Sequence, residues 1–162
     1  MYLLPEPFAL RERTDADHGF LQALYFSSRE DLQQAMADPA LLQQLMAMQQ
    51  NAQEMGFRQH FPQARQWLLL QSGHPIGRMV VDASPAQLHL VDIAVLPEAR
   101  RSGAATAALS ALRAHALARG LPLSLSVSHT NQAARRLYAK LGFTTTSQDD
   151  MLARMVWHGD CT

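Results

Sequence analysis

The sequence predicts a mixed α/β (α+β) domain that spans residues 1–162 as a single unit. Three observations predict this class. Apolar residues recur at helical spacing through the first sixty residues, extended apolar runs separated by turns follow residue 65, and the C-terminal third alternates strands with helices. Helices, an antiparallel meander and a strand–helix–strand–helix–strand series together indicate a sheet covered by helices.

The first sixty residues contain a short strand and two helices. The stretch "FALRER" (8–13) is the strand, and Thr14 and Asp15 are candidate N-caps of the helix that follows. A second helix begins at Asp38-Pro39, because a capping carboxylate precedes a proline at the first helical position. We expect it to end at Gly56 and to turn one apolar stripe towards the core: Leu41, Leu45, Met48, Ala52 and Met55.

The remaining elements follow from changes of period and from turn residues. "SGH" and "SPAQ" are turns that separate three strands, and the third of these is nearly continuously apolar, which indicates a central strand. The predicted strands are 66–71, 75–82, 88–96, 121–128 and 151–157. The predicted helices are 103–119, which stops at Gly120, and 131–142.

Composition excludes several classes of protein. The chain has 14 basic and 14 acidic residues, so it lacks the excess of positive charge that would attract nucleic acid or a membrane surface. Cys161 is the single cysteine, which excludes an internal disulfide and a cysteine metal site. The seven histidines show no paired ligand spacing, and we predict no metal. The N-terminus does not read as a signal peptide, which predicts a cytoplasmic protein.

The segment "LPEARRSGAATAALSAL" (96–112) joins the central strand to an alanine-rich helix. A helix N-terminus presents unpaired N–H groups and partial positive charge, so it can bind an anion. Gly103 lets a ligand approach the backbone, and the donors of Arg101 and Ser102 lie beside it. The segment therefore indicates a phosphate site, or else a plain strand-to-helix turn with solvated arginines.

The helix at 131–142 places Asn131 and Tyr138 two turns apart on one face, with Ala134 between them. A small residue flanked by an amide and a phenol can line a narrow slot. The alternative is that Tyr138 is a tyrosine of the core.

These two segments together resemble the GCN5-related N-acetyltransferases (GNAT). That family has Arg/Gln-x-x-Gly-x-Gly/Ala after its fourth strand, here Arg100, Gly103 and Ala105. Its second segment matches Asn131, Ala134, Leu137, Tyr138, Gly142 and Phe143. The resemblance implies a mostly antiparallel sheet of six to seven strands with about four helices, in which the fourth and fifth strands splay apart.

The resemblance also implies acetyl-CoA as co-substrate. The backbone of Ile93, Ala94 and Val95 would pair with the pantetheine arm, and N–H groups of the helix N-terminus would hold the pyrophosphate. The implied cofactor-binding residues are Ile93, Ala94, Val95, Arg100, Arg101, Ser102, Gly103, Ala104, Ala105, Thr106, Asn131, Ala134 and Tyr138. The family often has glycine where this chain has Arg101 and Ala105. The difference at Arg101 matters if φ is positive there, because a side chain then costs about 1–2 kcal/mol.

Acetyl transfer to an amine needs an acid for the leaving thiolate and a route for the amine proton. Tyr138 is the candidate acid. One branch of the family has a glutamate as general base where this chain has Ser126, which cannot serve. The general base of this chain could therefore be His89, Asp92 or a water relay. His89 has the better intrinsic pKa. Strand alternation predicts that His89 and Asp92 lie on opposite faces.

The acceptor is expected to be a primary amine of a small molecule or peptide. The family fold implies that the acceptor site is walled by Ser27–Glu30, the methionine-containing helix and the turn at 147–150. Within these segments Glu30, Asp149 and Asp150 could attract a cationic amine, or they could be solvated surface charges. The alternatives are a non-catalytic acyl-CoA-binding module and a nucleotide-binding protein, the latter disfavoured because its glycine motifs are missing. We expect a monomer or homodimer.

Overall fold

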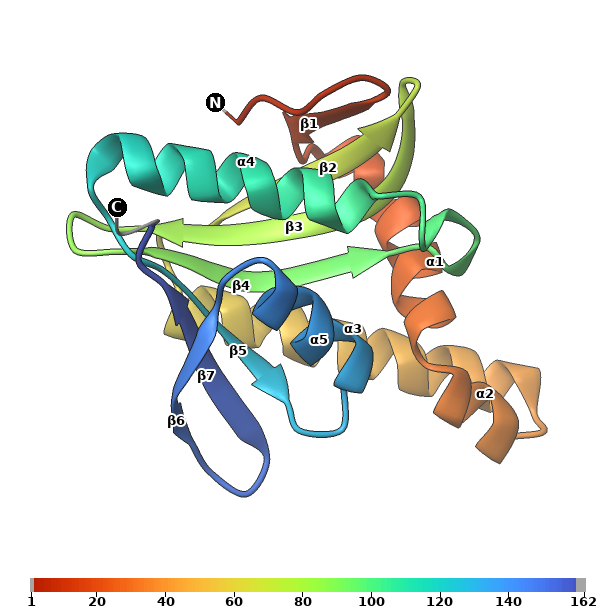
Figure 1. The fold of residues 1–162 in the computed structure, drawn as a ribbon. Coiled ribbons are helices and arrows are strands. Elements are labelled where there is room, and N and C mark those ends of the chain that lie inside the picture. Colours follow the sequence, from red (N-terminus) through yellow and green to blue (C-terminus); the bar gives the residue numbers. More distant parts are fainter. Residues whose placement is uncertain (1, 160–162) are drawn as a thin grey trace.

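The computed structural model describes residues 2–159 and confirms the mixed α/β class (Figure 1). Within that range a seven-stranded sheet runs in the order β1-β2-β3-β4-β5-β7-β6. The strands are β1 (Phe8–Glu12), β2 (Arg65–Gln71), β3 (His74–Ala83), β4 (Leu88–Val95), β5 (Leu123–Ser128), β6 (Thr144–Gln148) and β7 (Leu152–Trp157). The helices are α1 (His18–Ser28), α2 (Glu30–Ala35), α3 (Pro39–His60), α4 (Ala104–Arg119) and α5 (Gln132–Lys140), with short 3₁₀ turns η1 (Asp15–Asp17) and η2 (Pro97–Ala99).

Helices cover both faces of the sheet (Figure 1). The buried side chains of α4 and α5 join one core cluster with alternate residues of β2, β3, β4 and β5, whereas α1 packs Leu21 and Leu24 against Leu68 on the other face. The helix α3 lies on that second face beside α1. Within residues 2–159, none of these helices is long and apolar enough to cross a membrane.

The central strands diverge as the family resemblance implied. β4 and β5 pair in parallel at three positions, the last of which joins Leu90 to Leu125. β4 then continues to Val95 and β5 to Ser128 without pairing to each other, and Figure 1 shows β5 turning away from β4. The other neighbouring pairs of the sheet are antiparallel. One edge of β4 is therefore open where its neighbour departs.

Three predictions about the elements were wrong or incomplete. The strand β6 was missed because its sequence, "TTTSQ", is exposed throughout and has no apolar alternation. The helix α2 was also missed, and it has no buried residue. The helix α3 passes Gly56 and ends at His60.

The predicted apolar stripe of α3 does not face the core. Leu41, Met48 and Met55 are more than half exposed, at 52%, 68% and 56%. The buried residues of this helix are instead Leu42, Met46 and Gln50. The polar residue Gln50 lies within the buried face of α3, so a search for the most hydrophobic face selects the wrong side of the helix.

Candidate active site

Three hollows adjoin where β4 and β5 separate. The α4 groove, about 480 Å³, runs along the N-terminus of α4 and faces α5. The β4–β5 slot, about 140 Å³, lies between the two strands and is lined by Tyr138. The α1–α3 cavity, about 480 Å³, opens between α1, α3 and β4. The cavity shares Val95 and Arg100 with the groove, and Asp92 and Asn131 with the slot, so it adjoins both.

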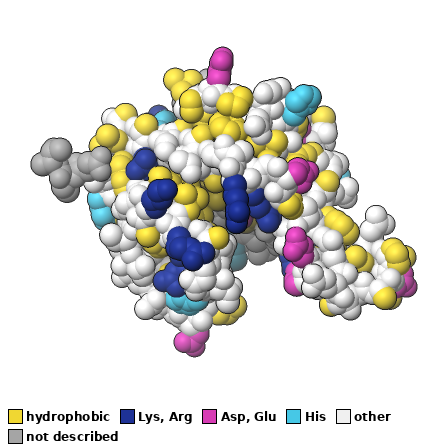
Figure 2. Space-filling view, turned by 45° about the vertical axis from the view of Figure 1, so that its right-hand side comes forward, with side chains coloured by type: hydrophobic (Ala, Val, Ile, Leu, Met, Phe, Trp, Pro, Cys, Tyr) yellow, Lys and Arg dark blue, Asp and Glu magenta, His cyan; other side chains and the backbone are white. Residues whose placement is uncertain are grey.

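The turn before α4 has the geometry of an anion cradle. Gly103, at the N-cap, has φ +89°, and no side chain within the described residues caps this helix. Its first N–H groups are therefore free to bind a ligand. The groove is lined by the predicted residues Arg100, Arg101, Gly103, Ala104, Ala105, Thr106 and Ala134. Figure 2 shows Lys and Arg side chains gathered around a hollow near the centre of its view.

Two residues of this turn differ from the simplest expectation. Ser102 does not line the groove, and its hydroxyl donates to the carbonyl oxygen of Ala99 at 2.6 Å. Arg101 adopts φ +63°, the left-handed conformation that penalises a side chain by about 1–2 kcal/mol. Strain of this kind persists where the surrounding structure imposes it, and it clusters at ligand sites.

The open edge of β4 offers backbone groups from alternate residues. The carbonyl of Ala94 faces β3, where a side chain on Gly77 would collide with it. The carbonyl of Val95 faces the other way and accepts a hydrogen bond from Nε of Arg100 at 3.3 Å. Because backbone polar groups alternate along a strand, Ile93 and Val95 face the open edge and Ala94 does not. The expected backbone role of Ala94 stays a prediction, which this orientation does not favour.

Asn131 and Tyr138 both line the β4–β5 slot. The side-chain oxygen of Asn131 accepts from the Ala134 N–H at 3.1 Å and so caps α5. Tyr138 is 7% exposed and packs on Phe143, with ring centroids 5.8 Å apart. Burial, with a smaller contribution from the charge of Asp92, raises the pKa of Tyr138 to about 12. The phenol therefore keeps its proton at neutral pH and can act as an acid.

A β-bulge changes the expected arrangement of His89 and Asp92. Leu90 pairs with Val81 and Asp92 with Val80, so Val91 is an extra residue in β4. One extra residue shifts the alternation of side chains by one position. His89 and Asp92 consequently lie on the same face of the sheet, the face covered by α3, and the prediction of opposite faces is wrong.

His89 lies outside the three hollows. It sits where β4 and β5 are still paired, its Nδ1 is 2.7 Å from the Ser124 hydroxyl, and its ring stacks on Phe61 with centroids 5.3 Å apart. Burial lowers the pKa of His89 and so favours the neutral ring. The structure does not bring this candidate base to the site.

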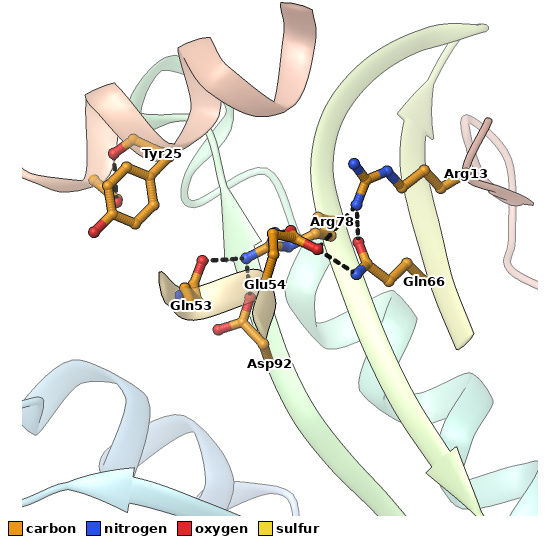
Figure 3. A network of polar contacts seen from close by, with 8 residues as sticks. Arg13, Tyr25, Gln53, Glu54, Gln66, Arg78 and Asp92 are labelled. Carbon is orange, nitrogen blue, oxygen red and sulfur yellow. Dashed lines mark hydrogen bonds and ion pairs between the residues drawn. The ribbon is translucent and has the colours of Figure 1, made fainter. Parts of the chain in front are cut away.

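Asp92 lies in both the slot and the cavity, within a buried polar network (Figure 3). Its Oδ2 accepts from Nη2 of Arg78 at 2.8 Å. Arg78 is 5% exposed and also donates to Glu54 at 3.0 Å and to the Gln53 side chain at 3.1 Å. Sequence patterns did not indicate Arg78, Glu54 or Gln53, although a charged residue inside the apolar strand "PIGRMVVD" is a signal that could have found Arg78.

The acceptor wall is only partly the one expected. Ser28 and the helix α3, through Gln53, do line the α1–α3 cavity, but Glu30, Asp149 and Asp150 do not. Asp149 instead caps the β6–β7 turn, where its Oδ1 accepts the N–H groups of Met151 at 2.8 Å and Leu152 at 2.7 Å. Those hydrogen bonds lower the pKa of Asp149. Among residues 2–159, no group of three or more His, Cys, Asp or Glu side chains is arranged to hold a metal.

Comparison with known proteins agrees with this geometry. The sequence model of the acetyltransferase (GNAT) family matches residues 24–143, a range that includes both motifs. The chain belongs to the acetyltransferase (GNAT) family. It is therefore an acyltransferase that uses acetyl-CoA as co-substrate. A search of curated protein sequences finds no significant match.

Solved structures confirm the fold. The chain is similar to PaiA N-acetyltransferase from Thermoplasma acidophilum in complex with coenzyme A, with a TM-score of 0.67 and 15% identity over 94% of this chain and 99% of that one. It is also similar to RimL, a ribosomal L7/L12 α-N-protein acetyltransferase in complex with coenzyme A, with a TM-score of 0.70 and 16% identity over 97% of each chain. It is similar as well to the Salmonella typhimurium acetyltransferase that modifies the N-terminal serine of 50S ribosomal subunit protein L7/L12. The TM-score is 0.70 and the identity 16%, over 98% of this chain and 99% of that one.

Proposed function

We propose that this acetyltransferase moves the acetyl group of acetyl-CoA directly to a primary amine of a small molecule or peptide. The observation that carries the proposal is the slot between β4 and β5. It adjoins the α1–α3 cavity, which suits an acceptor and also borders the α4 groove, which suits the cofactor, and it holds Tyr138 and Asp92 in its walls.

The residues of the groove fit coenzyme A. Uncapped N–H groups at the start of α4 would bind the pyrophosphate, with Arg100 and Arg101 supplying charge. The polar backbone groups of Ile93 and Val95 would pair with the amides of the pantetheine arm as an added strand would. Acetyl-CoA supplies a thioester whose acetyl group is activated for transfer.

The chemistry assigned to the protein is proton transfer and orientation. The amine nitrogen forms a bond to the acetyl carbon, the carbon–sulfur bond breaks, and Tyr138 gives its proton to the departing sulfur. Asp92 faces the cavity and binds the incoming ammonium, which loses one proton to water before its nitrogen attacks. The second proton, released from the nitrogen as the amide forms, returns through water to the Tyr138 phenolate. In this scheme water takes the amine proton, which is one of the alternatives that sequence reasoning left open beside His89 and Asp92, and Asp92 orients the amine.

The test is a thiol-release assay with acetyl-CoA and a panel of primary amines. We expect Tyr138→Phe to lower kcat by about 10²- to 10⁴-fold, the usual contribution of a general acid, and to leave acetyl-CoA binding unchanged. Tyr2→Phe is the matched control, because Tyr2 packs on Trp67 and His115, outside the residues that line the three hollows.

A non-catalytic acyl-CoA-binding module would give a different result. It would bind acetyl-CoA, release no CoA with any amine, and show no response to Tyr138→Phe. That outcome would replace the proposal.

A further inference from the structure

Arg78 fixes the orientation of two side chains at the wall of the α1–α3 cavity. Its Nη2 donates to Oε1 of Gln53 at 3.1 Å and to Oδ2 of Asp92 at 2.8 Å. A guanidinium can only donate hydrogen bonds, so Gln53 must turn its oxygen towards Arg78 and its NH₂ group away. Asp92 likewise keeps one carboxylate oxygen, Oδ1, for another partner.

The two remaining atoms form a donor–acceptor pair that faces the cavity. Both residues line the α1–α3 cavity, and neither Nε2 of Gln53 nor Oδ1 of Asp92 has a hydrogen-bond partner within residues 2–159. In Figure 3 both atoms point to the same side of Arg78, away from Arg13 and Gln66. Because their other atoms bind one and the same nitrogen, the two side chains are neighbours on the wall of the cavity.

The position of Arg78 is itself fixed. Its Nη1 donates to Oε1 of Glu54 at 3.0 Å, and the ring of Phe57 lies 5.5 Å from its Cζ. Glu54 is held in turn from the other side by Arg13 at 3.1 Å and Gln66 at 2.9 Å. The charge of Arg78 is thus balanced by two carboxylates, and its planar fork matches several partners at once, which a lysine cannot do.

We infer that this pair selects the acceptor, namely an amine with a hydrogen-bond-accepting oxygen on the neighbouring carbon, as in the α-amino amide of a peptide N-terminus. Asp92 binds the ammonium and the Gln53 NH₂ group donates to the carbonyl. In an α-amino amide the nitrogen and the carbonyl oxygen are about 3 Å apart, a span suited to adjacent protein groups. Arg78 is the positioning residue for both. The inference rests on the proposed acetyl transfer to an amine.

The kinetic test compares alaninamide with isopropylamine, which lacks the carboxamide. Gln53→Met removes the donor with little change of volume. We expect it to lower kcat/KM for alaninamide about 5- to 10-fold, mainly through KM, and to change isopropylamine by less than about twofold. The two amines differ in basicity, but that difference cancels when each variant is compared with the wild type. Gln44→Met, an exposed glutamine on the same helix, is the matched control.

Two further variants separate positioning from general damage. Asp92→Asn is expected to lower kcat/KM for both amines. Arg78→Lys keeps the positive charge but loses the fork, so it is expected to reduce the preference for alaninamide to the level of Gln53→Met even though Gln53 is intact. An equal loss on both amines in Gln53→Met would overturn the inference.

A binding readout distinguishes this inference from the proposed function. The side-chain NH₂ resonance of Gln53, assigned by its disappearance in Gln53→Met, is followed in the CoA-bound protein by ¹⁵N NMR. We expect alaninamide to shift it and isopropylamine to leave it in place. If alaninamide leaves it in place, the inference fails even when amines are acetylated. If the wild type acetylates no amine, the proposed function fails, and the NMR titration still decides whether the pair binds an amino amide.

Discussion

Replacing Gly77 by alanine tests the close approach of β3 to the cofactor edge of β4. Gly77 pairs with Val95. A Cβ atom at this position would collide with the backbone oxygen of Ala94 and would lie 3.3 Å from Cα of Val95. Backbone atoms cannot turn aside as a side chain can, so the two strands must separate locally.

The expected cost follows from that separation. Overpacking of a buried site costs about 1–3 kcal/mol, and weakening one ladder hydrogen bond adds about 1 kcal/mol. We therefore expect Gly77→Ala to lower the free energy of unfolding by about 3 kcal/mol in total. For a chain of this length each kcal/mol shifts Tm by roughly 2–4 °C, so the loss is about 6–12 °C.

The assay is thermal unfolding with and without acetyl-CoA. The variant should also show a smaller stabilisation by acetyl-CoA, because Val95 belongs to the edge assigned to the pantetheine arm. Gly56→Ala is the matched control: a Cβ there meets nothing within 4 Å, and alanine in a helix interior should raise stability by about 1 kcal/mol. A Gly77→Ala protein as stable as the wild type would refute the reasoning.

Three further predictions concern single side chains. Asp38→Ala removes the N-cap of α3, whose carboxylate accepts from the Ala40 N–H at 3.0 Å, and should cost about 1 kcal/mol in chemical denaturation. His89→Gln should change kcat by less than about threefold, whereas loss of a true general base would cost about 10²-fold or more. Burial raises the pKa of Tyr138 to about 12, so the folded state keeps a proton that the unfolded chain releases above pH 10. The stabilisation that this proton contributes is thus fully present below pH 10 and is lost as pH rises towards 12, by about 1 kcal/mol at pH 11. Tyr138→Phe should lack this alkaline loss in unfolding curves measured from pH 8 to 11.

The features that sequence predicted well depend on contacts between neighbours in the chain. Gly103 at the start of α4 and the spacing of Asn131 and Tyr138 on α5 have a local meaning, because the helix geometry alone sets which groups share a face. The groove and the slot were accordingly predicted from two short segments.

The features that sequence missed depend on contacts between distant residues. Arg78 is joined to Glu54, 24 positions earlier, and to Asp92, 14 positions later. Which face of α3 meets the sheet is decided by that network and by the packing of α1, and not by the hydrophobicity of α3. Gln50 is buried on that face while Met48 is 68% exposed.

The bulge at Val91 links these distant contacts to the chemistry. With regular alternation, Asp92 would face the side of the sheet where Met79, opposite Ile93, is fully buried in the α4 core. A carboxylate there would be buried without a partner, at a large cost. One inserted residue instead turns Asp92 towards Arg78. The same irregularity precedes the stretch of β4 that has lost its partner β5, so a single extra residue accompanies both the carboxylate of the acceptor cavity and the open edge of the cofactor groove.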